Sequence, residues 1–243
     1  MTVSLNIVSN CLPLKNLSED AQRAFSEVAR EIPFRKDERL VPLGQPLQRL
    51  LVLTHGLAKL VGVSANGHER ILYVHRTGEL VGPTVLLDNF RHDYEVCAMC
   101  TGQALSVSRR DLLAIGRRHP SVIVVLAQEV SRLLHAMTER VMSATSAEVP
   151  VRLSKLLLDF AYRNGDEPED FVPLSHPLTH EVMAQIVGAS RPHTSTVLRD
   201  LEQLGAVMRK SRRGLLVRPS RLTTIVESGE LATLSEGTRA PAW

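Results

Sequence analysis

The sequence has few cysteines and no long hydrophobic segment, and these absences exclude several classes of protein. Three cysteines among 243 residues, an odd number, argue against a disulfide framework and fit a reducing compartment. No apolar run reaches the roughly 18 residues of a membrane-spanning helix. The N-terminus also lacks a basic region followed by a hydrophobic one. We therefore expect a cytoplasmic protein without a membrane partner.

Sequence motifs of enzyme active sites are missing as well. There is no glycine-rich phosphate loop, no nucleophile motif and no regularly spaced set of metal ligands. Cys97 and Cys100 stand three residues apart, and such positions face opposite sides of an extended strand, so small core thiols are favoured over a metal site. We expect no enzymatic activity and no metal.

The most informative stretch lies between residues 178 and 217. Thr179 can cap a short helix whose apolar residues recur at three-and-four spacing until Gly188. Ser190 can cap a second helix with Pro192 in its first turn, where the missing N–H costs nothing. The apolar face of this helix consists of Val197, Leu198, Leu201 and Leu204. The pattern predicts a helix-turn-helix, whose second helix can lie in the major groove of DNA.

A basic hairpin is predicted after the second helix, over residues 207–217. Its tip would carry Arg209, Lys210, Arg212 and Arg213. Residues 176–221 contain eight Arg or Lys and three Asp or Glu, a net charge of +5, whereas the whole chain carries +3. Charge, helix pair and hairpin together indicate double-stranded DNA as the partner rather than only a solvated charged face.

The run from Gly188 to Glu202 resembles the recognition helix of the cyclic-AMP receptor protein/FNR (CRP/FNR) family of bacterial transcription regulators. The resemblance extends over roughly the whole chain. It implies an α+β fold with an N-terminal cyclic-nucleotide-binding-like β-roll, a long dimerisation helix and a C-terminal winged helix-turn-helix. The corresponding segments are 1–119 for the β-roll, 120–148 for the long helix, 149–226 for the DNA-binding domain and 227–243 for a tail.

The region after Ile32 has the pattern expected of the β-roll. Glycines punctuate short apolar runs at intervals of 12, 11 and 11 residues, which fits successive strands and tight turns. Strands are predicted at 50–53, 58–63 and 71–74, with a hairpin turn at 65–68, and the pattern continues over 94–107.

The family's nucleotide site is only partly matched. Pro83 stands where nucleotide-binding members have a glutamate for the ribose hydroxyl. In those members a small hydroxyl residue and an alanine follow the phosphate-binding arginine, but Arg91 is not followed by these residues. One of two adjacent hydroxyl residues on the long helix is replaced by Met137. Each unpaired polar or charged group costs about 1–3 kcal/mol or more, so cyclic AMP is disfavoured and the effector is unknown. The expected pocket comprises Gly78, Gly82, Arg91, Met137 and Thr138.

Two alternatives to a nucleotide sensor stay open. One is a ligand-independent DNA-binding protein whose β-roll is only structural. The other is a redox- or haem-responsive regulator, for which the candidate residues are Cys11, Cys97, Cys100, His75 and His135. Three thiols fall short of the four that an iron–sulfur cluster usually needs.

A long helix is predicted from Pro120 to about Ala147, ending before a hinge at Pro150. Apolar residues recur along it every seven positions, which is the pattern of a coiled coil. By the resemblance it is the seam of a homodimer. The expected seam residues are Ile123, Leu126, Val130, Leu133, Met137 and Ala144.

The resemblance also assigns DNA contacts. Ser190 and His193 are expected to touch phosphate, and Arg191 is the best candidate for a bidentate contact to guanine. Pro192 and Thr196 replace a base-reading glutamate and a second arginine of the family, so a different half-site is expected. RNA polymerase is the further partner implied by the family. The complete expected set is Thr179, Ser190, Arg191, His193, Ser195, Thr196, Arg199, Arg209, Lys210, Arg212 and Arg213.

Overall fold

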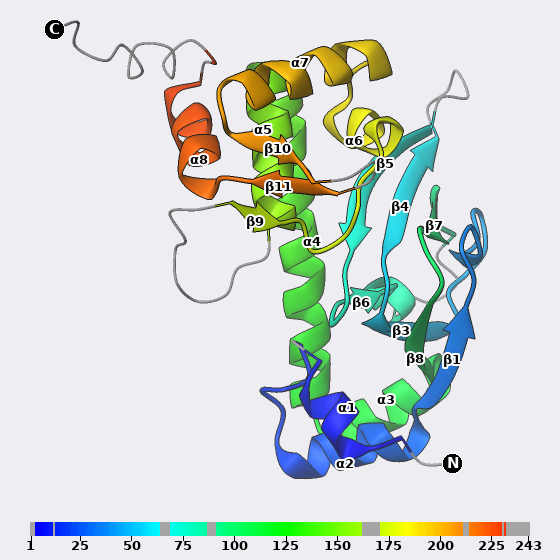
Figure 1. The fold of residues 1–243 in the computed structure, drawn as a ribbon. Helices are drawn as coiled ribbons and strands as arrows, with labels where there is room; N and C mark the ends of the chain where they lie inside the picture. Colours follow the sequence, from blue (N-terminus) through cyan, green and yellow to red (C-terminus); the bar gives the residue numbers. More distant parts are fainter. Residues whose placement is uncertain are drawn as a thin grey trace, which may run out of the picture. The chain divides into compact units, whose positions relative to one another are not determined.

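The computed structural model describes residues 3–11, 13–63, 69–86, 91–161, 171–210, 214–229 and 231. The chain divides into two compact units, residues 1–138 and 139–243. The division falls inside the long helix, which the sequence predicts as a segment of its own. Figure 1 labels the elements of both units.

The N-terminal unit combines two antiparallel sheets with helices. Its first sheet has the order β1-β8-β3-β6 and its second the order β2-β7-β4-β5. The strands are β1 (Arg30–Phe34), β2 (Arg39–Val41), β3 (Arg49–His55), β4 (Ala58–Val63), β5 (Glu69–His75), β6 (Leu80–Val81), β7 (Tyr94–Ala98) and β8 (Gly102–Ser108). The helices are α1 (Leu5–Ser9), α2 (Glu19–Val28), the 3-10 turn η1 (Pro83–Leu86), α3 (Arg109–Arg118) and the first part of α4 (Ser121–Ser146).

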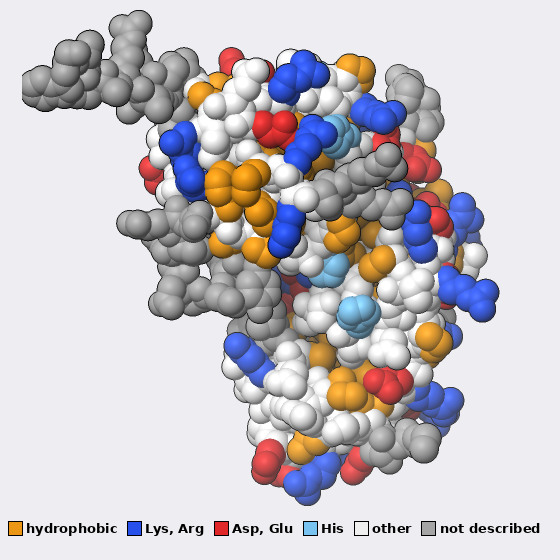
Figure 2. All heavy atoms as spheres, in the orientation of Figure 1, with side chains coloured by type: hydrophobic (Ala, Val, Ile, Leu, Met, Phe, Trp, Pro, Cys, Tyr) orange, Lys and Arg blue, Asp and Glu red, His pale blue; other side chains and the backbone are white. Residues whose placement is uncertain are grey.

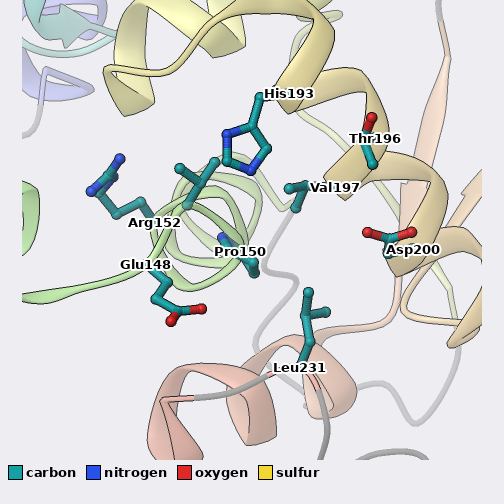
Figure 3. A pocket seen from close by; sticks show the side chains of 9 residues that line it. Glu148, Pro150, Arg152, His193, Thr196, Val197, Asp200 and Leu231 are labelled. Carbon is teal, nitrogen blue, oxygen red and sulfur yellow. The ribbon is translucent and has the colours of Figure 1, made fainter.

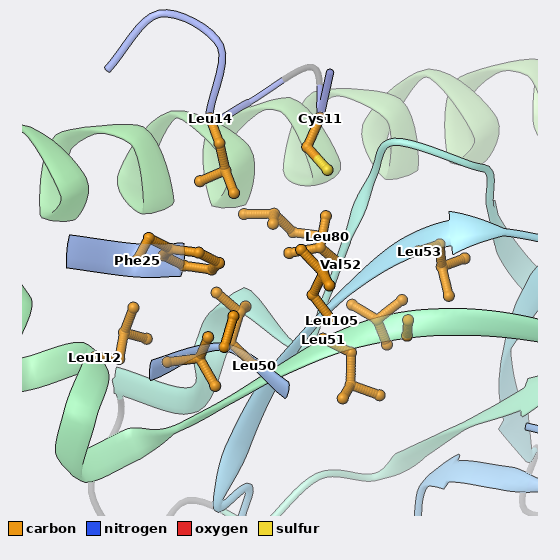
Figure 4. Close-up of a cluster of buried hydrophobic side chains, with 14 of the residues drawn as sticks. Cys11, Leu14, Phe25, Leu50, Leu51, Val52, Leu53, Leu80, Leu105 and Leu112 are labelled. Carbon is orange, nitrogen blue, oxygen red and sulfur yellow. The ribbon is translucent and has the colours of Figure 1, made fainter. Parts of the chain in front are cut away.

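One hydrophobic core joins the two sheets to the helices. Leu50 and Val52 of β3 and Leu105 of β8 are fully buried, as are Phe25 of α2 and Leu112 of α3. Figure 4 shows these side chains meeting in a single cluster. Complete burial of one such side chain contributes about 1.5–3 kcal/mol, so this packing holds the first sheet to α2 and α3.

The C-terminal unit contains a helix-turn-helix followed by a small antiparallel sheet of order β10-β11-β9. Its elements after α4 are α5 (Val149–Phe160), β9 (Val172–Pro173), α6 (His180–Val187), α7 (Arg191–Gln203), β10 (Val207–Arg209), β11 (Leu215–Val217) and α8 (Pro219–Ser228). The predicted fold class is confirmed: β-roll, long helix and winged helix-turn-helix are all present.

The ends of α4, α5 and α8 differ slightly from the predicted segment boundaries. Pro150 lies in the first turn of α5, and the break from α4 comes before it, at residues 147–148. α8 continues to Ser228, two residues into the expected tail. The expected hairpin turn at 65–68 and the tail apart from residues 227–229 and 231 lie outside the described residues.

The long helix α4 has two different apolar faces. Leu126 is 1% exposed and Val122 is likewise buried, while Ile123 and Met137 pack against the same core. Leu126 therefore lies inside the protomer's own core, and its expected place in a dimer seam is wrong. The exposed apolar positions of α4 are Val124, Ala127, Val130, Leu134, Val141, Met142 and Ala144.

Four side chains, called here the Arg132 cluster, join the β5–β6 segment to α4. The Arg132 guanidinium donates to Glu129 Oε2 at 2.7 Å and to Tyr73 Oη at 3.0 Å. Tyr73 in turn donates to Glu79 Oε2 at 3.1 Å, and Glu79 Oε1 lies 3.7 Å from Arg132 Nη1. Charge-assisted bonds of this kind are stronger than neutral ones, so the cluster ties the first half of α4 to the sheet.

His75 lies beside this cluster in the interior. Its ring centroid is 4.9 Å from that of Tyr73, and the side chain is 2% exposed. Burial, together with the positive charge of Arg132, lowers the pKa of His75 from 6.5 to about 3. The imidazole is therefore neutral at physiological pH.

We expect the neutral state of His75 to make the protein sensitive to acid. Below pH 6.5 His75 is protonated in the unfolded chain, whereas in the folded chain it stays neutral down to about pH 3. Between these values the free energy of unfolding therefore falls with decreasing pH, by up to about 1.4 kcal/mol per pH unit. His75→Leu removes this contribution. Between pH 6.5 and about pH 5 the free energy of unfolding of this variant should therefore fall by about 2 kcal/mol less than that of the wild type. Urea unfolding at several pH values measures the difference. His55→Leu, which replaces an exposed histidine, should keep the wild-type slope, and equal slopes for wild type and His75→Leu would contradict the assignment.

Candidate nucleic-acid interface

The first helix of the helix-turn-helix, α6, has definite signals at both ends. The Thr179 hydroxyl accepts a hydrogen bond from the Val182 amide at 3.2 Å and caps the N-terminus. Gly188 ends the helix with φ +68°, a left-handed conformation that glycine adopts without strain. Met183 and Val187 are buried. α6 is therefore held by its caps and one apolar face.

The second helix, α7, begins two residues later. The Ser190 hydroxyl accepts from the His193 amide at 3.3 Å, and Pro192 occupies the first turn. Val197, Leu198 and Leu201 are at most 3% exposed. This burial fixes which side of α7 faces outward. The exposed side carries Arg191, Pro192, His193, Thr196 and Arg199, with Ser195 half-buried.

The wing follows α7 as the β10–β11 hairpin, with β9 as its third strand. Val207 pairs with Val217, and both are buried, whereas Met208 points to the other face and is 43% exposed. Arg209 Nε forms an ion pair with Glu202 Oε1 of α7. The wing is thus attached to α7 through one of the cations expected to meet DNA. Lys210 is exposed. Arg212 and Arg213 lie outside the described residues.

The charge of this unit is mixed rather than uniformly basic. In the space-filling view, Lys and Arg side chains are spread over the C-terminal unit with Asp and Glu among them (Figure 2). The positive charge of Arg209 is partly balanced by Glu202. Affinity for phosphate therefore depends on individual exposed cations, of which Arg191 and Arg199 lie on α7 itself.

One contact in this region had no signal in the sequence. His180 Nδ1 of α6 lies 2.7 Å from Ser195 Oγ of α7. The two residues are 15 positions apart, and their meeting depends on how the two helices cross. Spacing along a single helix could not reveal it.

A hollow of about 450 Å³ lies beside α7 (Figure 3). Arg152, at its edge, donates from Nη1 to the Ala147 carbonyl at 2.7 Å, so its guanidinium binds the backbone just after the last turn of α4. The hollow thus brings the start of α5 close to the side of α7 that carries His193. Its lining residues are Glu148, Val149, Pro150, Arg152, His193, Thr196, Val197, Asp200 and Leu231.

The expected effector residues are arranged differently from a ligand pocket. Arg91 is exposed, and its Nη1 donates to the Gly44 carbonyl at 3.4 Å. The Thr138 hydroxyl donates to the Leu134 carbonyl within its own helix at 2.9 Å, and Met137 packs against the core. Gly78 and Gly82 have positive φ angles of 89° and 75° and form turns. Pro83 is buried.

The described residues show neither a membrane span nor a metal site. No helix among them is both long and apolar enough to cross a bilayer. No three His, Cys, Asp or Glu side chains in the described ranges lie together so that they could hold a metal ion. Cys11 and Cys97 are buried free thiols, and burial raises the pKa of each to about 11. Cys100 is a half-buried free thiol.

Comparison with known proteins gives matches over both units. The family model described as "Cyclic nucleotide-binding domain" matches residues 31–119, and "Crp-like helix-turn-helix domain" matches residues 151–225. A "Cyclic AMP receptor protein" of Thermus thermophilus is 30% identical over 176 residues, covering 70% of this chain and 78% of that protein. A "CRP-like cAMP-activated global transcriptional regulator" of Mycobacterium tuberculosis is 23% identical over 208 residues, covering 86% and 93%.

Solved structures share the fold at low sequence identity. FixK2 from Bradyrhizobium japonicum has a TM-score of 0.71 at 18% identity, covering 81% of this chain and 96% of that one. TTHA1359 from Thermus thermophilus, described as a transcriptional regulator of the CRP/FNR family, has a TM-score of 0.67 at 21% identity, covering 83% and 100%.

The left-handed glycine in the turn gives a test of the local structure. We expect Gly188→Ala to lower the free energy of unfolding by about 1–2 kcal/mol, because a Cβ is strained at positive φ. Gly188→Asn should cost less, since asparagine tolerates this conformation. Position 188 is exposed, so crowding should not mask the comparison. Thermal unfolding of the three proteins measures it, and equal stabilities would show that the turn does not impose this backbone conformation.

Proposed function

Because the chain belongs to the CRP/FNR family of DNA-binding transcription regulators, we propose that it binds a pseudo-palindromic DNA site as a homodimer, with one α7 in the major groove of each half-site. The protein is a regulator and not an enzyme. The observation that carries the proposal is the two-sided character of α7. One side is buried, and the other presents Arg191, Ser195 and Arg199 at intervals of four residues.

Base recognition is proposed to depend on Arg191. It is the first residue of α7, and its side chain is exposed. Residues at the start of a recognition helix contact base edges, and an arginine fork matches the O6 and N7 acceptors of guanine. Ser195, Thr196 and Arg199 would supply further contacts. Because Thr196 donates to the Pro192 carbonyl at 3.2 Å, its hydroxyl proton is engaged within the helix.

Phosphate contacts are proposed to surround this row. The Ser190 hydroxyl and His193 lie at the N-terminal turn of α7, and Thr179 lies at that of α6, where backbone N–H groups favour anions. Lys210, Arg212 and Arg213 of the hairpin would add sequence-independent affinity that falls with salt. Arg209 would contribute less than a free cation, because Glu202 pairs with it.

The exposed stripe of α4 is proposed to form the dimer seam. The stripe consists of five exposed residues and the half-buried Met137, which follow one another at alternating intervals of three and four positions. The exposed ones are Ala127, Val130, Leu134, Val141 and Ala144. This is the a/d pattern of a coiled coil. Of the seam residues expected from the sequence, Val130, Met137 and Ala144 fit this stripe. Leu134 and Val141 replace Leu126 and Leu133 as its principal members.

The effector is proposed not to be cyclic AMP bound in the family's usual manner. Pro83 and Val85 are buried, and Met137 packs against the core, so none of these three side chains offers a polar group to a nucleotide. A ligand-independent regulator is the second candidate. The observation that favours it is the Arg132 cluster, which connects the β5–β6 segment to α4 through direct side-chain contacts.

A redox or haem role receives less support from the described residues. The Cys11 and Cys97 thiols have pKa values of about 11 and remain protonated at neutral pH, whereas the thiolate is the reactive form. His75 is buried in the core.

As in the family generally, RNA polymerase is the expected further partner, and because the target is DNA we assign the protein to the cytoplasm.

The role of Arg191 can be tested without changing its charge. Arg191→Lys keeps the attraction for phosphate but replaces the planar fork that matches O6 and N7 of guanine by a single ammonium group. In selection from a random duplex library at fixed salt, we expect the wild type to enrich a symmetric motif and Arg191→Lys to lose its preference at one symmetric pair of positions. The loss at those positions should be about 5- to 150-fold, the value of a bidentate base contact. An unchanged motif would contradict the assignment of Arg191.

The seam can be tested with two adjacent residues of similar exposure. Val141 and Met142 are 64% and 61% exposed, but successive residues point about 100° apart on a helix. We expect Val141→Glu to convert the dimer to a monomer, because a charge would be buried in the seam. Met142→Glu, the control, should leave the dimer intact. Sedimentation equilibrium measures both, and a dimer that survives Val141→Glu would show that the seam lies elsewhere.

A further inference from the structure

The hydrogen bond between His180 and Ser195 connects a residue outside the recognition helix to one inside it. His180 is the first residue of α6, directly after the N-cap Thr179. Ser195 lies on α7 midway between Arg191 and Arg199. Both side chains are half-buried, and the Nδ1–Oγ distance is 2.7 Å. We propose that His180 is a positioning residue for DNA recognition, which holds the Ser195 hydroxyl in one orientation and thereby sets the hydrogen-bonding group that α7 presents to one base pair.

The reason lies in the chemistry of a hydroxyl group. A free serine hydroxyl rotates, and it can donate to one base edge or accept from another. Serine therefore contributes little base preference on its own. When the imidazole engages the hydroxyl, either its proton or one of its lone pairs is occupied. If the imidazole accepts the hydroxyl proton, only the lone pairs of Oγ are left to face a donor edge. If the imidazole donates, one lone pair is taken and the O–H proton points away from the ring. In either case the orientation of the hydroxyl is set, which serine alone cannot achieve.

The charges around the imidazole favour a neutral ring. Burial lowers the pKa of His180, and the positive charges of Arg209 on β10 and Arg191 on α7 lower it further. Glu202 on α7 acts in the opposite direction, but it is also paired with Arg209. At neutral pH the contact is therefore one between a neutral imidazole and a hydroxyl. Such a ring can either accept from Ser195 or donate to it, according to its tautomer.

A purely structural role for this bond makes a different prediction. α6 and α7 are in contact apart from this bond, and Met183 and Val187 of α6 and Leu198 of α7 are buried. If the His180–Ser195 bond only strengthened this packing, its loss would lower stability and weaken binding to all sequences equally. A positioning role changes the preference at one symmetric pair of base positions.

Three substitutions of His180 separate these roles. Asparagine places a polar group close to the position of Nδ1, glutamine places it one carbon farther out, and alanine removes it. In selection from random duplexes, we expect His180→Asn to keep the wild-type motif. His180→Ala and His180→Gln should each lose preference at the same positions as Ser195→Ala, by about three- to tenfold, the value of one hydrogen bond. His55→Ala, far along the sequence in the N-terminal unit, controls for loss of a histidine.

A double-mutant cycle supplies the second readout. If His180 acts through Ser195, His180→Ala added to Ser195→Ala should cause no further loss of preference. Additive losses would overturn the proposal, as would an unchanged motif in His180→Ala. If His180→Ala does not fold, as judged by circular dichroism, the comparison of the asparagine and glutamine variants decides.

The inference rests on the proposed DNA-binding role of α7, and the two can fail separately. A wild-type protein without any sequence preference would contradict the proposed function itself. A wild-type motif that persists in His180→Ala and His180→Gln would leave that function standing and remove only the positioning role.

Discussion

The orientation of α7 depends above all on the burial of one side of it. Val197, Leu198 and Leu201 lie in the core of the C-terminal unit, and their removal from water fixes the rotation of the helix about its axis. Everything proposed about DNA follows from that rotation. Because the buried residues occupy one side, Arg191, Ser195 and Arg199 are presented together on the other, and the wing is held to the same helix by the pair Glu202–Arg209.

The local elements could be predicted from the sequence because their signals are local. The caps at Thr179 and Ser190 and the turn glycine Gly188 each act within one helical turn, and the structure shows all three at the expected positions. The strands of the β-roll and the long helix were likewise predicted from hydrophobic periodicity and glycine spacing. Such patterns identify an element and its apolar side without reference to the rest of the chain.

The contacts between elements could not be predicted in the same way. α4 is apolar on two sides, and a seven-residue repeat does not reveal which side meets the chain's own core. The repeat therefore places Leu126 in the seam, although it is buried inside the protomer, and does not include the exposed Leu134. The Arg132 cluster and the His180–Ser195 bond join residues on different elements, so each depends on tertiary packing that no single segment encodes.

In the β-roll, Pro83 and Val85 are buried and Met137 packs against the core, and we propose that cyclic AMP is not the effector of DNA binding. The direct test is the affinity of nucleotide-free protein for its selected duplex, measured at fixed salt with and without saturating cyclic AMP. We predict the same affinity with and without cyclic AMP. Tight binding under both conditions would in addition favour the ligand-independent regulator. Tightening by about fivefold or more, within the usual range of allosteric coupling, would contradict the proposal and show that the β-roll still works as a nucleotide sensor.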